Sequence, residues 1–115
     1  MVLSGSAGVT FPNNDVQATG ALGVGQTWQN VTSSRAVNTT YTNTTGRPIM
    51  VVFTPNASAN LYGYAVVNGL NIAYQQFTPS GGGGCAAWSF VVPSGGTYSI
   101  TNTSNLTLLS WFELR

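Results

Sequence analysis

Few side chains in this sequence can transfer protons, bind metals or attack an electrophile. The acids are Asp15 and Glu113, the only bases are three arginines, and lysine and histidine are absent. Acid–base and nucleophilic catalysis need such titratable groups. A glycosidase could use two carboxylates about 5–10 Å apart, but Asp15 stands in a polar turn that can bond its own backbone, and Glu113 lies within reach of an arginine. We therefore expect a turn cap and an ion pair, and no enzyme.

The same shortage of ligands argues against a metal or a cofactor. One chain with no histidine, a single cysteine and two acids cannot assemble a four-ligand zinc site. Three Asp15 carboxylates gathered on an oligomer axis would be the alternative for a hard cation. The glycine run 81–84 lacks the lysine of a phosphate-binding loop and is interpreted as a flexible connection. Cys85, alone, is interpreted as a small buried hydrophobe.

Composition narrows the remaining classes of function. Only 4% of the residues are charged, against about 25% in ordinary domains, and the net charge is +1. Such a chain cannot neutralise a row of phosphates, so we expect no nucleic-acid binding. No apolar run approaches the roughly 18 residues of a membrane span, and we expect neither a signal peptide nor membrane insertion. A nearly neutral surface favours association, so an oligomer is expected.

The pattern of short apolar runs between turn residues predicts an all-β fold. Signals for helices are scarce, and the runs suggest seven or so short strands of about five to eight residues each. We expect an antiparallel β-sandwich or jelly-roll-like domain over residues 23–115, preceded by a short extended stalk segment over residues 1–22. Strands are predicted at residues 28–31, 39–45, 49–54, 61–67, 70–77, 86–92, 97–101 and 106–115.

Several of these strands carry more detailed predictions. The continuous apolar run 49–54 is typical of a central buried strand. Runs 39–45 and 49–54 are separated by Gly-Arg-Pro and read as an antiparallel hairpin. Asn68-Gly69 supplies the two positive-φ positions of a type I′ turn, which predicts a second hairpin. The alternating aromatic residues are predicted to lie in the core or an interface, namely Trp88, Phe90, Tyr98, Trp111 and Phe112.

Spaced groups of residues resemble the C-terminal module of bacteriophage and prophage tail fibres and other host-contacting tail proteins. They are Gly25-Gln26-Thr27-Trp28-Gln29-Asn30-Val31 with Arg35, Thr40 to Ile49 (TYTNTTGRPI), Phe90 to Pro93 with Gly96-Thr97-Tyr98, and Leu109 to Arg115. Gly8 to Pro12 with Val16-Gln17 resembles the element that links a fibre shaft to its head, with Asn13-Asn14-Asp15 in place of the usual Asp-Gly turn. The resemblance covers about residues 8–54 and 86–115; residues 55–85 match no family pattern.

The resemblance implies a function as well as a fold. It implies a homotrimeric receptor-binding tip domain at the distal end of a virion tail fibre. This domain would attach to a glycan of the bacterial surface, either lipopolysaccharide or capsule. The alternative is a structural module that trimerises and caps a fibre without touching the receptor.

Residues around the predicted Asn68-Gly69 hairpin are the candidate glycan contacts. Sugar sites combine flat aromatic faces with fixed amides and hydroxyls. This stretch has that composition, although it would also suit an ordinary exposed hairpin. Arg47, in a turn, is a candidate rim residue for an anionic sugar. The candidate contacts are Tyr62, Tyr64, Asn68, Asn71, Tyr74, Gln75, Gln76 and Arg47.

Overall fold

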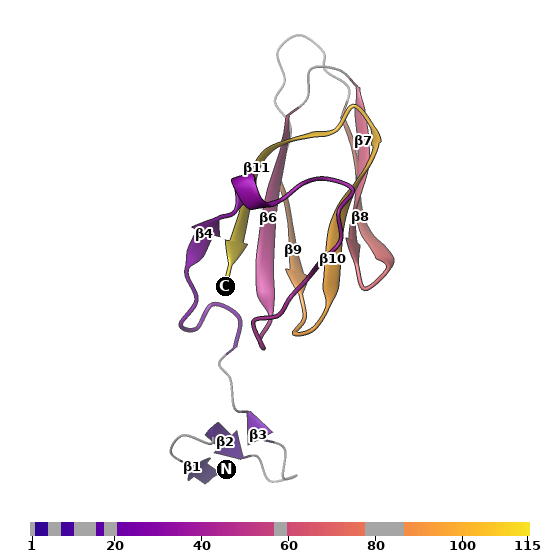
Figure 1. The fold of residues 1–115 in the computed structure, drawn as a ribbon. Helices are drawn as coiled ribbons and strands as arrows, with labels where there is room; N and C mark the ends of the chain where they lie inside the picture. The colour runs from indigo at the N-terminus through magenta and orange to yellow at the C-terminus, as the bar shows by residue number, and fades with distance from the viewer. Residues whose placement is uncertain (1, 5–7, 11–15, 18–20, 57–59, 78–86) are drawn as a thin grey trace.

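A computed structural model describes residues 2–4, 8–10, 16–17, 21–56, 60–77 and 87–115 (Figure 1). No α-helix occurs within these ranges, and a single 3-10 turn, η2, spans Thr32–Ser34. The strands are β1 Val2–Ser4, β2 Gly8–Thr10, β3 Val16–Gln17, β4 Trp28–Asn30, β5 Tyr41–Thr42, β6 Ile49–Asn56, β7 Leu61–Val67, β8 Leu70–Phe77, β9 Trp88–Val92, β10 Thr97–Ser104 and β11 Thr107–Leu114.

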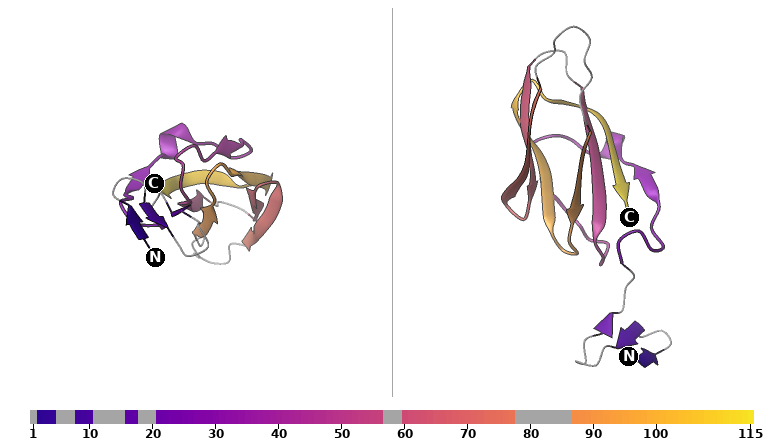
Figure 2. Two further views of the ribbon diagram at one scale, coloured as in Figure 1. Left: turned by 90° about the horizontal axis from the view of Figure 1, so that it is seen from below. Right: turned by 180° about the vertical axis from the view of Figure 1, so that it is seen from behind.

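Two four-stranded antiparallel sheets pack as a β-sandwich, as the sequence predicts. One sheet has the order β5-β10-β7-β8 and the other the order β4-β11-β6-β9. The edge strands β4 and β8 lie at opposite sides of the sandwich in Figures 1 and 2. β1, β2 and β3 form a separate small antiparallel sheet within the segment predicted as a stalk.

The core fills the space between the two sheets. In β6, β7 and β9 every second residue is buried, because successive side chains point to opposite faces of a sheet. Phe53, Trp88 and Trp111 pack in its centre, with the Trp88 ring tilted and the Trp111 ring edge-on to Phe53 at centroid distances of 5.4 Å and 5.6 Å. The buried core residues are Ile49, Val51, Phe53, Leu61, Ala65, Val67, Trp88, Phe90, Val92, Tyr98, Ile100, Leu106 and Trp111.

The predicted hairpin of residues 39–45 and 49–54 is wrong. β5 contains only Tyr41–Thr42 and pairs with β10, whereas β6 pairs with β11 and β9 in the other sheet. The chain between them therefore crosses from one sheet to the other. The prediction of β6 as a central strand is confirmed, because it lies between two neighbours and buries alternate residues completely.

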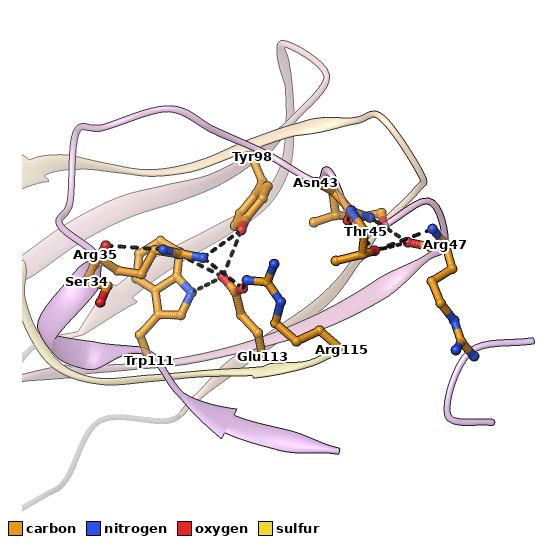
Figure 3. Close-up of polar contacts among 10 residues, drawn as sticks. Ser34, Arg35, Asn43, Thr45, Arg47, Tyr98, Trp111, Glu113 and Arg115 are labelled. Atoms are coloured by element: carbon orange, nitrogen blue, oxygen red, sulfur yellow. Dashed lines mark hydrogen bonds and ion pairs between the residues drawn. The ribbon is translucent and has the colours of Figure 1, made fainter. Parts of the chain in front are cut away.

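Asn43 explains why strand β5 ends so early. Its side chain is buried, and its Nδ2 donates hydrogen bonds to the carbonyls of Arg47, Val92 and Pro93 at 2.8–3.2 Å. Figure 3 shows the bond to Arg47. Its backbone N–H donates to the carbonyl of Gly96. The Asn43 amide thereby joins the 43–47 turn to the turn that follows β9.

The Asn68-Gly69 hairpin is confirmed. β7 and β8 pair in antiparallel register around it, and both turn residues have positive φ, 52° and 78°. Asn68 also accepts a hydrogen bond from the backbone N–H of Thr97 at 3.0 Å, which fixes the turn against β10. Asp15, Cys85 and the glycine run 81–84 lie outside the described residues, as do the predictions made for them.

Candidate functional site

Three tyrosines and a glutamine gather on the outer surface of the β5-β10-β7-β8 sheet. Tyr62 and Tyr64 come from β7, and Tyr74 and Gln76 come from β8. The ladder pairs Tyr64 with Tyr74 and Tyr62 with Gln76. Residues directly opposite each other in a ladder point to the same face of the sheet. We call this group the tyrosine face.

The rings of the tyrosine face lie close enough to form one aromatic surface. The ring centroids of Tyr64 and Tyr74 are 5.1 Å apart, and those of Tyr62 and Tyr74 are 6.5 Å apart. The rings are tilted against each other by 37–44°, and Tyr74 is 51% exposed. Gln76 donates a hydrogen bond to the Tyr62 hydroxyl at 3.2 Å, which orders the amide beside the rings.

Hydroxyl groups from β10 extend the tyrosine face on its other side. Thr101 pairs with Tyr64, and Ser104 pairs with Tyr62. Two parallel rows of side chains therefore cross strands β10, β7 and β8. One row is Thr101, Tyr64 and Tyr74, and the other is Ser104, Tyr62 and Gln76. Desolvation raises the pKa of the Tyr74 hydroxyl, and the neighbouring Tyr64 and Tyr62 raise it further. At neutral pH this hydroxyl is therefore protonated and can donate a hydrogen bond.

The other predicted contacts separate from this cluster. Asn71 pairs with Val66, one outward position closer to the turn than Tyr64. Gln75 pairs with Gly63 on the opposite side of the sheet. The side chain of Asn68 is engaged with Thr97 at the turn. Only Tyr62, Tyr64, Tyr74 and Gln76 of the eight predicted residues therefore form one compact group.

Arg47 lies away from the tyrosine face. Its Nη2 donates hydrogen bonds to the carbonyls of Val24 and Ala21 in the loop that precedes β4. Because the sequence has three arginines but only two acids, at least one arginine must bind a carbonyl, water or an aromatic ring instead of a carboxylate. Arg47 binds backbone carbonyls. The structure thus gives this guanidinium a local role in holding the 21–25 loop.

Glu113, the acid considered for catalysis, is completely buried and bound on all sides (Figure 3). Arg35 donates to both its oxygens at 3.0 Å, and Arg115 donates to Oε1 at 2.9 Å. The Tyr98 hydroxyl and the Trp111 indole N–H both donate to Oε2, at 2.8 Å and 3.1 Å. The predicted ion pair is confirmed, with two arginines in place of one.

Hydrogen bonding decides the ionisation of this network. Burial alone would raise the pKa of Glu113, but the hydrogen bonds from Arg35, Tyr98 and Trp111 lower it overall. Burial, together with the hydrogen bond to Glu113, raises the pKa of Tyr98 to about 12. Glu113 is therefore a carboxylate in the folded protein, with its lone pairs occupied by donors.

Searches for similar proteins found no matching family model, no curated protein and no solved structure. Within the described ranges, no three side chains of the metal-binding types come together. The same ranges contain no helix that is long and apolar enough to cross a membrane.

Two features of the surface escaped the sequence analysis. The first is the contribution of Thr101 and Ser104 from β10, which no local pattern links to the tyrosine hairpin. The second is a band of apolar side chains on the outer surface of the other sheet, where Trp28, Val52 and Phe112 line an open depression of about 340 Å³. The unbroken apolar run of residues 49–54 was the available signal for the second feature.

Proposed function

We propose that this chain is a non-enzymatic attachment module that binds a bacterial surface polysaccharide through the tyrosine face. The observation that carries the proposal is the arrangement of three contacting tyrosine rings between an ordered amide and two hydroxyl side chains. The aromatic planes offer the apolar C–H faces of a sugar ring a stacking surface. The amide and hydroxyls offer donors and acceptors at its rim.

The placement of the charged side chains favours a neutral glycan. Arg35 and Arg115 pair with Glu113, and Arg47 binds backbone carbonyls. The described charged residues are thereby engaged away from the tyrosine face. An anionic sugar would find no charged partner there, whereas a neutral one needs none. This argument refines the broader expectation of lipopolysaccharide or capsule and removes Arg47 from the proposed contacts.

The wider setting of the proposal comes from the resemblance to phage tail fibres. A jelly-roll-like tip domain at the distal end of a virion fibre, assembled as a homotrimer, would present several copies of the tyrosine face to a cell surface. Repeated copies raise the avidity for a repeating polysaccharide without any new contact. The sandwich architecture supports this setting, since its strands hold the tyrosines on a rigid sheet.

Binding to whole cells tests the function directly. The purified chain is labelled and incubated with a panel of bacterial strains and with mutants of the same strains that lack surface polysaccharide. We expect retention on at least one strain, loss of retention on its polysaccharide-deficient mutant, and protection of that strain from infection. Equal retention on parent and mutant would rule out the polysaccharide as receptor.

A capping module remains the second candidate function, because the apolar depression lined by Trp28, Val52 and Phe112 on the β4-β11-β6-β9 sheet suits a partner protein. In that case the chain would hold a fibre end together and would not contact the receptor. Replacement of Tyr74 would then leave cell binding by the whole fibre unchanged.

A further inference from the structure

The two rows of side chains on the tyrosine face repeat the same chemistry. We call them the first rung, with Thr101, Tyr64 and Tyr74, and the second rung, with Ser104, Tyr62 and Gln76. Each rung combines a hydroxyl side chain of β10 with an aromatic ring of β7 and a residue of the edge strand β8. All six residues are exposed or partly exposed. A sugar-like ligand therefore meets the same combination of groups twice on one surface.

A bulge in β10 brings the second rung into line. The register shifts between Asn102 and Ser104, and this shift places Ser104 opposite Tyr62. Tyr62 and Tyr64 are two residues apart along β7, a distance of about 6.6 Å in a strand. A bulge also increases the local twist of a strand pair, so the two rungs are rotated against each other.

The inclination of the rings limits what a single sugar can contact. The plane of Tyr74 is inclined by 44° to that of Tyr64 in its own rung and by 37° to that of Tyr62 in the other. The apolar C–H face of a pyranose ring is roughly flat, so it can stack on only one of two aromatic planes inclined this steeply. Since the ring centroids of Tyr62 and Tyr74 are also 6.5 Å apart, stacking on both rungs requires a second sugar unit.

We propose that the tyrosine face binds at least two consecutive sugar units of a linear glycan, one on each rung, with the chain running along β7. This inference rests on the proposed function and adds the length and the direction of the bound segment. The hydroxyl side chains of β10 and the Gln76 amide lie on opposite sides of the β7 rings. They can therefore bond the hydroxyl groups on both flanks of a chain that follows the strand.

The surface beyond the first rung leaves room for the chain to continue. The next pair of outward residues toward the Asn68-Gly69 turn is Ser99 and Val66. Both side chains are smaller than a tyrosine and half-buried, so neither forms a wall across the path of the chain. A surface of this shape favours a stretch of polysaccharide over a single terminal sugar.

Fragments of graded length test the inference. The surface polysaccharide of the strain that retains the chain best is partly hydrolysed, and fractions of one to four sugar units are titrated into the protein beside the intact polymer. We expect fragments of two or more units to bind at least about tenfold more tightly than single sugars. Single sugars that bind as tightly as the longer fragments would overturn the inference and leave the proposed function standing. Absence of binding by the intact polymer would reject both.

A matched pair of variants assigns the second sugar to the second rung. Tyr62→Ser removes the ring of that rung, whereas Tyr62→Phe keeps the ring and removes only the hydroxyl that accepts a hydrogen bond from Gln76. We expect Tyr62→Ser to bind single sugars as the wild type does and to lose most of the gain between one and two units. Tyr62→Phe should keep that gain.

Near-UV circular dichroism shows whether both variants retain the folded sandwich. An unchanged gain between one and two units in folded Tyr62→Ser would contradict the assignment to the second rung. If Tyr62→Ser unfolds, the length series of the wild-type protein decides the proposal.

Discussion

The guanidinium of Arg35 holds the carboxylate of Glu113 with two hydrogen bonds of 3.0 Å across the interior edge of the sandwich. It also stacks on Tyr41, with its carbon 4.6 Å from the ring centroid. The 3-10 turn that precedes Arg35 is thereby tied both to the last strand and to β5. One charged side chain therefore connects segments that are 78 residues apart in the sequence.

Removal of the Glu113 charge should destabilise the protein strongly. In Glu113→Gln the mostly buried Arg35 loses its carboxylate, and breaking a buried ion pair from one side costs several kcal/mol. We expect the free energy of unfolding to fall by about 3 kcal/mol in urea denaturation. Arg115→Gln is the control, since its side chain is more exposed than that of Arg35 and Arg35 still neutralises the carboxylate. Equal losses in the two variants would show that the buried pair has no special weight.

The same carboxylate should make the stability depend on pH in the acid range. The folded state lowers the pKa of Glu113 below its ordinary value of 4.5. Its contribution to stability is therefore fully present above about pH 4.5 and is lost as the pH falls through the lower, folded-state pKa. Thermal melts from pH 7 to pH 2 should show a falling midpoint below about pH 4.5, with a flatter profile in Glu113→Gln. Parallel profiles for the two proteins would assign the acid sensitivity to other groups.

Gly63 should tolerate no larger residue. A Cβ at this buried position would lie 2.5 Å from Leu106 Cδ1 and 2.8 Å from the carbonyl oxygen of Thr101. Because the carbonyl belongs to the neighbouring strand, relief requires β7 and β10 to separate. We expect Gly63→Ala to lower the free energy of unfolding by about 1–3 kcal/mol, the range found for overpacked cores. An unfolding curve identical to the wild type would mean that the two strands part easily.

The proposed neutral site predicts that glycan binding is nearly independent of salt. Dissolved ions screen interactions between charges and have little effect on stacking or on neutral hydrogen bonds. We expect the dissociation constant for a bound polysaccharide to change less than about twofold between 50 mM and 500 mM NaCl. A steep loss of affinity with salt would instead place an anionic sugar against an arginine such as Arg47.

The all-β class, most strands and the Asn68-Gly69 turn could be predicted from the sequence because each depends on neighbouring residues. Alternation identified the inward side of β9 and β10, and the Asn-Gly pair defined its own turn. The predicted hairpin before β6 failed because the long-range hydrogen bonds of Asn43 override the local Gly-Arg-Pro signal. Sequence separation also explains why Thr101 and Ser104 were missed beside the tyrosines, since only strand pairing brings β10 against β7.

Calorimetric titration of a purified neutral surface polysaccharide into the protein tests the central claim most directly. Tyr74 contacts both other rings of the tyrosine face, whereas Ile72, on the same strand, is 48% exposed and lies outside this group. We predict that Tyr74→Ser weakens binding by about tenfold, equivalent to about 1.4 kcal/mol, and that Ile72→Ser binds as the wild type does. Unchanged affinity in folded Tyr74→Ser would contradict the assignment of glycan binding to the tyrosine face.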